Sequence, residues 1–83
     1  MCENFSMKDI EVKFANAVKK RRKELGLSQE EFASKAGIHR TYASSIERAK
    51  VQVSIAIADQ VAGALKLSLS ELFARVESEK NKP

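Results

Sequence analysis

Residues 28–48, SQEEFASKAGIHRTYASSIER, decide the fold, because they have the pattern of two short helices joined by a tight turn. Ser28 is a typical helix N-cap, and Glu31 three positions on can reach back to its backbone amide. The first helix is therefore predicted to start near Gln29. Gly37 permits a left-handed turn residue at little steric cost. Such a helix pair is the arrangement that offers a helix to the DNA major groove.

Each of these two helices has a predicted inward face and a predicted outward face. The inward residues, at helical spacing, are Phe32, Ala33 and Ala36 in the first helix and Ala43 and Ile46 in the second. The outward residues of the second helix are Arg40, Thr41, Ser44 and Ser45. The second helix thus exposes one arginine and several hydroxyl groups.

The rest of the chain predicts three further helices and no strand, so the expected fold class is all-α, a compact bundle of five helices. The first helix is expected over residues 9–25, with an apolar side marked by Ile10, Phe14, Val18 and Leu25. Ser54 is predicted to cap the fourth helix, and Ser68 with Glu71 repeats the capping-box pattern for the fifth.

These elements predict one domain with short ends. Residues 1–8 are expected to be a flexible N-terminal segment, residues 9–76 the folded domain and residues 77–83 a polar C-terminal tail that frays. The chain has 83 residues, of which 43% are hydrophobic, and this is enough for one modest core.

Composition also limits the chemistry that the chain can perform. Its apolar stretches are too short to span a bilayer, so we expect a cytoplasmic protein that does not associate with membranes. Cys2 is the only cysteine and His39 the only histidine, which excludes an internal disulfide and provides no zinc cluster. No cofactor or metal is expected, and Cys2 is predicted to be an exposed bystander.

Positive charge is concentrated around the two-helix motif. The formal net charge is +4, and residues 17–50 hold nine basic and four acidic side chains, so this part alone carries +5. A basic centre that coincides with such a motif is typical of a protein that binds duplex DNA. For Lys19, Lys20 and Lys23 the interpretation as a solvated helix face is preferred, because a five-residue run wraps around the helix.

The motif resembles the helix-turn-helix of phage-repressor and Cro-like transcriptional regulators of the xenobiotic-response-element type. The likeness extends to VKKRRKELGLSQEEFA, similar to that family's first two helices, and to SIAIADQVAGALKLSLSELF, similar to its fourth helix and the start of its fifth. Within the family, HRTYASSIER is most similar to the controller proteins of restriction-modification systems. The resemblance implies a lambda-repressor-like fold and a DNA-binding regulator of transcription.

Groove chemistry and this resemblance together give the outward side chains expected roles. Arg40, near the amino end of the second motif helix, can bond guanine O6 and N7 as a fork and is the first candidate for reading a base. The further candidates for base contact are Thr41, Ser44 and Ser45. The residues expected to contact phosphate are Gln29, His39, Tyr42, Arg48 and Lys50. Partial burial stays open for Tyr42, and a solvated turn position for His39.

The loop after the motif departs from close relatives. Ala49 and Val51 stand where these relatives often have a glycine and a further basic residue, which weakens any transfer of base contacts from that loop. Arg22 and Glu47, by contrast, fall where the family often has an arginine and a glutamate that bridge the first and third helices. A mostly buried pair of this kind fixes orientation, so Arg22→Ala is expected to lower DNA binding mainly through misfolding.

A single recognition helix reads too few base pairs to select one site in a genome, so we expect a homodimer on an inverted repeat of double-stranded DNA that controls its own operon. The residues expected at the dimer contact are Ile55, Leu69 and Phe73, with a place in the core as their alternative role. Contact with RNA polymerase could use Glu30 or Glu31, against the alternative of a solvated surface with Glu31 as a capping partner.

Two other classes of function fit the sequence less well. An enzyme is not expected, because no carboxylate, glycine-rich loop or metal cluster completes a site around His39, Ser44 and Ser45. The main alternative is an antitoxin whose helix-turn-helix also binds a partner protein. Only about eight residues follow the fifth helix, fewer than the long toxin-wrapping segment that many antitoxins add.

Overall fold

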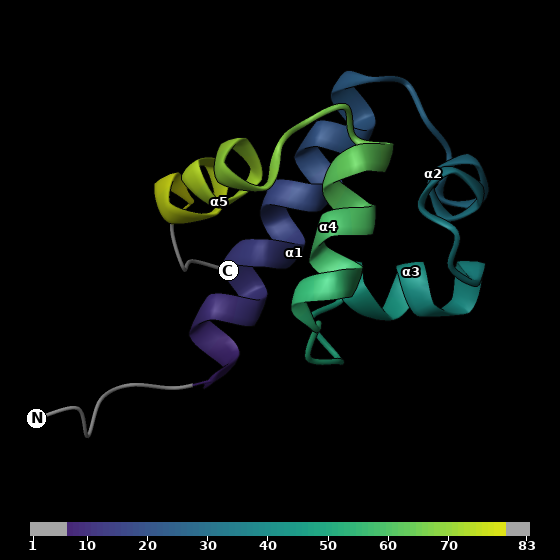
Figure 1. Ribbon diagram of the computed structural model, residues 1–83. Helices are drawn as coiled ribbons and strands as arrows, with labels where there is room; N and C mark the ends of the chain where they lie inside the picture. Colours follow the sequence, from purple (N-terminus) through teal and green to yellow (C-terminus); the bar gives the residue numbers. More distant parts are fainter. Residues whose placement is uncertain (1–6, 80–83) are drawn as a thin grey trace, which may run out of the picture.

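The computed structural model describes residues 7–79, which form five helices and confirm the predicted all-α class (Figure 1). The helices are α1 (Met7–Glu24), α2 (Gln29–Ala36), α3 (Arg40–Glu47), α4 (Ile55–Ala64) and α5 (Leu69–Ser78). Residues 1–6 and 80–83 lie outside the described part of the chain, and so do the predictions for Cys2 and for most of the two terminal segments.

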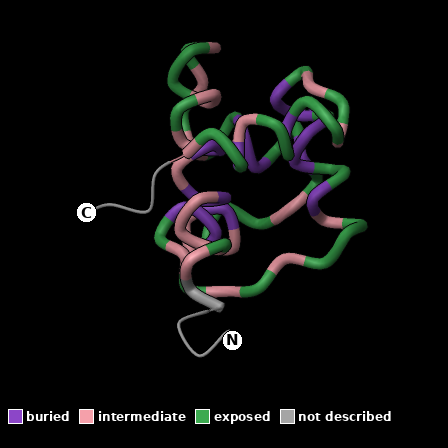
Figure 2. The backbone as a smooth tube through the Cα atoms, turned by 90° about the vertical axis from the view of Figure 1, so that its left-hand side faces the viewer, coloured by how far each residue is buried: buried purple, intermediate pink, exposed green. Residues whose placement is uncertain are grey.

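The helices pack around α1, the longest of them. α1 packs against α5 and α3, α2 against α3 and α4, and α4 against α5. In Figure 1, α2 and α3 lie together on one side of α1, and α5 lies on the other. Every helix contributes to the core, because the largest fully buried side chains include Val18, Phe32, Ile46, Val61 and Leu72. Figure 2 shows the buried stretches turned toward the inside of the bundle.

Serine residues start three of the helices, as predicted. The Ser54 hydroxyl accepts a hydrogen bond from the Ile57 amide at 3.1 Å at the start of α4. At α5, Ser68 Oγ accepts from the Glu71 amide at 3.1 Å, and Glu71 Oε1 accepts from the Ser68 amide at 2.8 Å. Each cap satisfies amides that a helix start leaves without an acceptor.

Two predicted helix boundaries need correction. α1 begins at Met7, two residues early, with Asp9 in its first turn, where a negative charge favours the helix dipole. It ends at Glu24 because Gly26, at φ +72°, turns the chain away. α5 continues to Ser78 instead of fraying after residue 76. An ion pair of 3.2 Å between Lys20 Nζ and Glu79 Oε2 connects its end to α1.

The exposure of α1 also differs from the prediction at one position. Phe14 and Val18 are buried, but Ile10, predicted on the apolar side, is 48% exposed. The reason is that Ile10 lines an open groove near the start of α1, where no other helix covers it completely. Lys20 is predicted on a solvated face, and its side chain is 67% exposed although it pairs with Glu79.

Candidate nucleic-acid interface

The two motif helices are joined as the sequence predicts. Ser28 Oγ accepts from the Glu31 amide at 3.0 Å, and Glu31 Oε1 accepts from the Ser28 amide at 2.8 Å, which completes the capping box of α2. Gly37 ends α2 at φ +72°, and its neighbour Ile38 donates its amide to the Ala33 carbonyl at 3.0 Å. Left-handed backbone of this kind costs an L-residue free energy that glycine avoids. The sequence therefore fixes the turn between α2 and α3.

A contact from outside the motif holds the same turn. Gln60 on α4 donates its side-chain amide to the Ala36 carbonyl, the last of α2, at 2.9 Å. A Cβ added to Gly37 would lie 3.4 Å from Gln60 Nε2, so the Gln60 side chain lies directly against the turn. Sequence reasoning missed Gln60, because no local pattern relates it to a turn 24 residues earlier.

α3 exposes the predicted residues to different degrees. Arg40 and Thr41, in its first turn, are exposed, whereas Ser44 and Ser45 are half-buried. Tyr42 is half-buried and packs against the core, which is the partial burial left open above. His39 is exposed at the N-cap, and its side chain makes no capping hydrogen bond. The first turn of α3 is thus the part most accessible to a partner.

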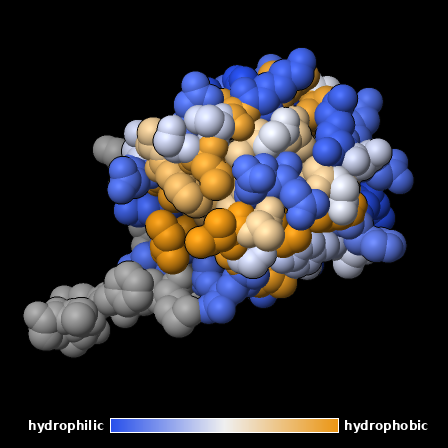
Figure 3. Space-filling view, viewed as in Figure 1, coloured by the Kyte–Doolittle hydropathy of each residue, from blue (hydrophilic) through white to orange (hydrophobic). Residues whose placement is uncertain are grey.

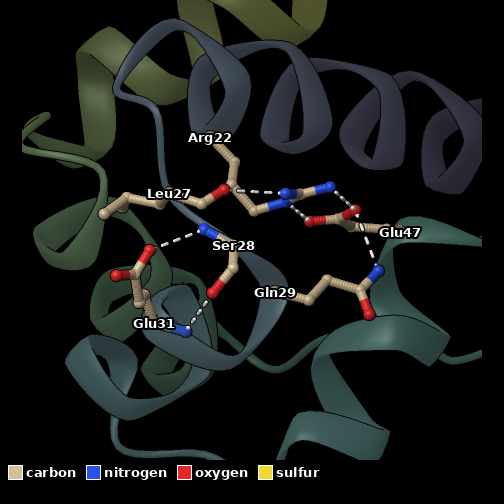
Figure 4. Close-up of polar contacts among 6 residues, drawn as sticks. All are labelled: Arg22, Leu27, Ser28, Gln29, Glu31 and Glu47. Atoms are coloured by element: carbon tan, nitrogen blue, oxygen red, sulfur yellow. Dashed lines mark hydrogen bonds and ion pairs between the residues drawn. The ribbon is translucent and has the colours of Figure 1, made fainter.

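The far end of α3 is anchored by a buried ion pair, shown in Figure 4. Arg22 on α1 donates Nε–H to Glu47 Oε2 at 2.6 Å and Nη2–H to Glu47 Oε1 at 3.0 Å, a two-pronged contact. The side chains are 12% and 2% exposed, respectively. Arg22 Nη1–H also donates to the Leu27 carbonyl at 2.8 Å. The structure places this pair where the family resemblance implied it.

A fourth residue, which sequence reasoning did not place there, joins this cluster. Gln29, the first residue of α2, donates Nε2–H to Glu47 Oε1 at 3.2 Å (Figure 4). The four residues Arg22, Leu27, Gln29 and Glu47, here called the α3 anchor, join the end of α1, the start of α2 and the end of α3. No sequence signal could have shown the Gln29 contact, because it depends on how closely α2 and α3 approach.

The chain leaves α3 through a residue with left-handed backbone. Ala49 has φ +57°, with its amide donated to the Ile46 carbonyl at 3.0 Å and the Lys50 amide to the Ser45 carbonyl at 2.9 Å. Arg48 and Lys50 flank it and are exposed. Ala49 is thus a residue other than glycine in the left-handed region, a conformation that costs an L-residue free energy.

Basic side chains on the two sides of the molecule have different partners. On the α5 side, Arg21 donates Nε–H to the Leu65 carbonyl at 3.0 Å and Nη1–H to Glu24 at 3.1 Å. At α3, Arg40, Arg48 and Lys50 form no ion pair with any residue from 7 to 79. The cations at α3 therefore remain available to a negatively charged partner.

An apolar groove lies away from the first turn of α3. It has a volume of about 330 Å³ and is lined by residues of α1, of the end of α3, of the segment between α3 and α4, of α4 and of α5. Three large apolar side chains at it are exposed, Ile55 to 76%, Ile10 to 48% and Phe73 to 43%. Figure 3 shows apolar side chains gathered between α5 and the start of α4. Leu69, by contrast, is half-buried against the core and does not line the groove.

Two kinds of feature are absent from residues 7–79. None of the helices there is both long enough and apolar enough to cross a membrane. In the same residues, no three or more histidine, cysteine, aspartate or glutamate side chains are grouped so that they could hold a metal ion.

Comparison with known proteins relates this arrangement to a family. Residues 18–72 match the family model described as helix-turn-helix. The control protein C.MunI of a Mycoplasma species is 46% identical over 74 residues, which cover 88% of this chain and 100% of that protein. All of the predicted base-reading residues lie inside the matched range.

Solved structures of related proteins give the same result. The restriction-modification controller protein C.AhdI from Aeromonas hydrophila is 36% identical with a TM-score of 0.73, covering 76% of this chain and 96% of that one. Wild-type C.Esp1396I, also a restriction-modification controller protein, is 30% identical with a TM-score of 0.78, covering 88% and 91%. These three relatives are named as control or controller proteins and not as enzymes. The chain therefore belongs to the helix-turn-helix family and is a regulator of the restriction-modification controller type.

Proposed function

We propose that the chain is a sequence-specific transcriptional regulator that binds an inverted-repeat operator as a homodimer in the cytoplasm and controls its own operon. The observation that carries this proposal is the setting of Arg40. Its side chain is exposed in the first turn of α3 and has no ion-pair partner among residues 7–79, while Glu47 at the other end of α3 is fixed. An arginine so placed can bond a guanine in the major groove from a helix whose far end is held by the Arg22–Glu47 ion pair.

The residues around Arg40 have supporting roles in this proposal. Thr41 is exposed beside it, and Ser44 and Ser45 offer hydroxyls farther along α3 for base edges or thymine methyl groups. The proposed phosphate contacts are Gln29, His39, Tyr42, Arg48 and Lys50. The start of α2 supports this, because the backbone amides of Gln29 and Glu30 have no intrahelical acceptor, whereas the Glu31 amide is already taken by Ser28 Oγ.

The apolar groove supports a dimer. Ile55 and Phe73 are exposed at it, together with Ile10, and such a group of large apolar side chains on a small protein marks a contact surface. We assign Ile55 and Phe73 to the contact between two copies, with Leu69 at its edge. A two-fold axis there would have to set the two α3 helices about 34–36 Å apart to match successive major grooves.

An activating contact with RNA polymerase would use Glu30. Both Glu30 and Glu31 are exposed on α2, but the Glu31 carboxylate already accepts the Ser28 amide in the capping box. Glu30 makes no ion pair within the described chain and is the freer of the two.

The experiment that tests the proposal is selection of binding sites from a randomised duplex pool, followed by salt-dependent titration of the selected site. An inverted repeat bound by two copies is expected. Arg40→Ala should weaken binding by about 1–3 kcal/mol and relax the preference at one base position. Lys50→Ala is the matched control, which should weaken binding equally for all sequences and reduce the salt slope by about one.

The possible results separate the candidate functions. Arg40→Ala with unchanged base preference would remove Arg40 from base reading. Binding by the wild type that is steeply salt-dependent and indifferent to sequence would contradict the proposed function and favour an antitoxin-like protein-binding role.

A further inference from the structure

Gln29 is held by a protein group at the position from which it is expected to contact DNA. Its Nε2–H donates to Glu47 Oε1 at 3.2 Å. The orientation of the amide follows from chemistry, because the opposite orientation would set the Gln29 carbonyl oxygen against a carboxylate oxygen with no proton between them. Figure 4 shows the nitrogen directed at Glu47 and the oxygen directed away from it.

The hydrogen-bonding groups that remain free on this amide limit how the Gln29 side chain can bind a phosphate. The side-chain nitrogen has two N–H groups, and Glu47 takes one of them. A phosphate oxygen only accepts hydrogen bonds, so the Gln29 carbonyl cannot bond it. Within the side chain, the second N–H on the same nitrogen is the group that can donate to a phosphate. One nitrogen atom therefore serves Glu47 and the phosphate together.

Glu47 in turn determines how α3 is oriented. It is the last residue of the eight-residue α3, and Arg40 is the first. A helix of this length is about 12 Å long and moves as a rigid rod, so a displacement at Glu47 tilts the end that carries Arg40. Within residues 7–79, Glu47 makes the only side-chain hydrogen bonds recorded between α3 and the other helices.

We propose that Gln29 is a positioning residue as well as a phosphate contact, which couples the phosphate at the start of α2 to the orientation of α3 and so to base reading by Arg40. A plain phosphate contact fixes register and carries no sequence information. Gln29 differs because the nitrogen that bonds the phosphate also holds the carboxylate that anchors α3. This inference rests on the proposed function and deepens it.

The test compares affinity with base discrimination. Gln29→Met keeps the length and shape of the side chain but has no N–H group. It is expected to lower affinity for the selected site and to narrow, about two- to tenfold, the affinity ratio between that site and variants changed at the base that Arg40 reads. Lys50→Ala, which removes a side chain that makes no ion pair with Glu47, is the matched control and should leave that ratio unchanged. Melting curves must show both variants folded at the binding temperature.

A measurement on the protein without DNA tests whether the Gln29 side chain donates a hydrogen bond to Glu47. The chain has three glutamines and three asparagines, so the side-chain amide signal of Gln29 in a ¹⁵N spectrum can be assigned by its absence in Gln29→Met. One of its two protons should exchange slowly with water. Fast exchange of both protons would overturn the inference.

The outcomes distinguish this inference from the proposed function. If the wild type discriminates between sites and Gln29→Met loses affinity equally at all of them, Gln29 is a phosphate contact alone and the inference is overturned. If the wild type itself does not discriminate, the proposed function fails, and the coupling fails with it.

Discussion

Arg21 and Arg22 are adjacent on α1, yet they stabilise opposite sides of the molecule by different means. Arg22 joins α1 to α3 through Glu47, with side chains 12% and 2% exposed. Arg21 lies on the α5 side, where Glu24 also pairs with Arg75 at 3.2 Å, and the three side chains are 22%, 49% and 37% exposed. We call this second group, Arg21, Glu24 and Arg75, the α5 network.

The difference in burial determines what each cluster can do. A buried pair with paired hydrogen bonds holds one geometry, and it is costly to break because the remaining charge is left without water. An exposed network is screened by solvent and adds little per pair. The helix proposed to enter DNA is thus fixed by the rigid cluster, and α5, at the other side, is held by an adjustable one.

Removing each arginine in turn should give the largest effect and the clearest contrast. Arg22→Ala leaves Glu47 buried without its partner and is expected to lower the free energy of unfolding by about 3–5 kcal/mol. Arg21→Ala loses one hydrogen bond to the Leu65 carbonyl and an exposed pair, and should cost about 1 kcal/mol. Urea titration of both variants at one temperature measures the two values.

Binding data decide whether Arg22 acts only through the fold. A small domain has little stability in reserve, so loss of DNA binding by Arg22→Ala should follow its loss of folded protein. Arg22→Lys, which keeps the charge but not the fork, should be intermediate. Normal melting together with lost binding would show that Arg22 contacts phosphate directly.

The α3 anchor also shows how far sequence reasoning reaches. The capping boxes at Ser28 and Ser68 and the turn at Gly37 were predicted from the sequence and are confirmed, because their partners lie three or four residues apart. Arg22 and Glu47 are 25 residues apart. Nothing local relates them, and only the family resemblance placed them together. The exposed state of Ile10 could not be predicted either, because periodicity gives the face of a helix but not what covers it.

The residues after the two anchored positions test a smaller effect. Ala49 lies two positions after Glu47. Lys66 directly follows Leu65, whose carbonyl accepts a hydrogen bond from Arg21. Ala49 and Lys66 both have left-handed backbone, at φ +57° and +60°, respectively. Ala49→Gly and Lys66→Gly should each raise the free energy of unfolding by about 0.5–1 kcal/mol, because relief of left-handed strain outweighs the added entropy of the unfolded chain. Thermal melting compares the two.

Gly37→Ala is the converse control for this pair of substitutions. It introduces strain at φ +72° and a Cβ 3.4 Å from Gln60 Nε2, and should therefore destabilise the protein. A loss of stability in Ala49→Gly would mean that the stiffness of alanine after α3 supports the α3 anchor. If Lys66→Gly raises the free energy of unfolding and Ala49→Gly leaves it unchanged, the stiffness of Ala49 supports the α3 anchor by a smaller amount.

The proposed site could be predicted in part from the sequence. Inward and outward faces of α3 followed from helical spacing, and Ala43 and Ile46 are buried as expected. Ser44 and Ser45 are only half-exposed, because spacing does not show how far a neighbouring helix overlaps an outward face. The Gln29 contact with Glu47 required three helices in position, so no pattern in the chain could have predicted it.

The α5 network should give the smallest effect, visible only in acid. Hydrogen bonds from Arg75 and then from Arg21 lower the pKa of Glu24 below the ordinary glutamate value of about 4.3. A group whose pKa is lower in the folded state contributes stability that is fully present above its unfolded pKa and is lost as pH falls through its folded pKa.

The melting temperature of Glu24→Gln should therefore lie below that of the wild type near neutral pH. The gap should shrink as the pH falls below about 4.3, because protonated Glu24 then resembles the glutamine. In an Arg75→Ala background the gap should already be narrower at neutral pH, since the hydrogen bond that lowers the pKa of Glu24 most is gone. A gap that stays constant from neutral pH to strong acid would mean that the charge of Glu24 does not hold α5 to α1.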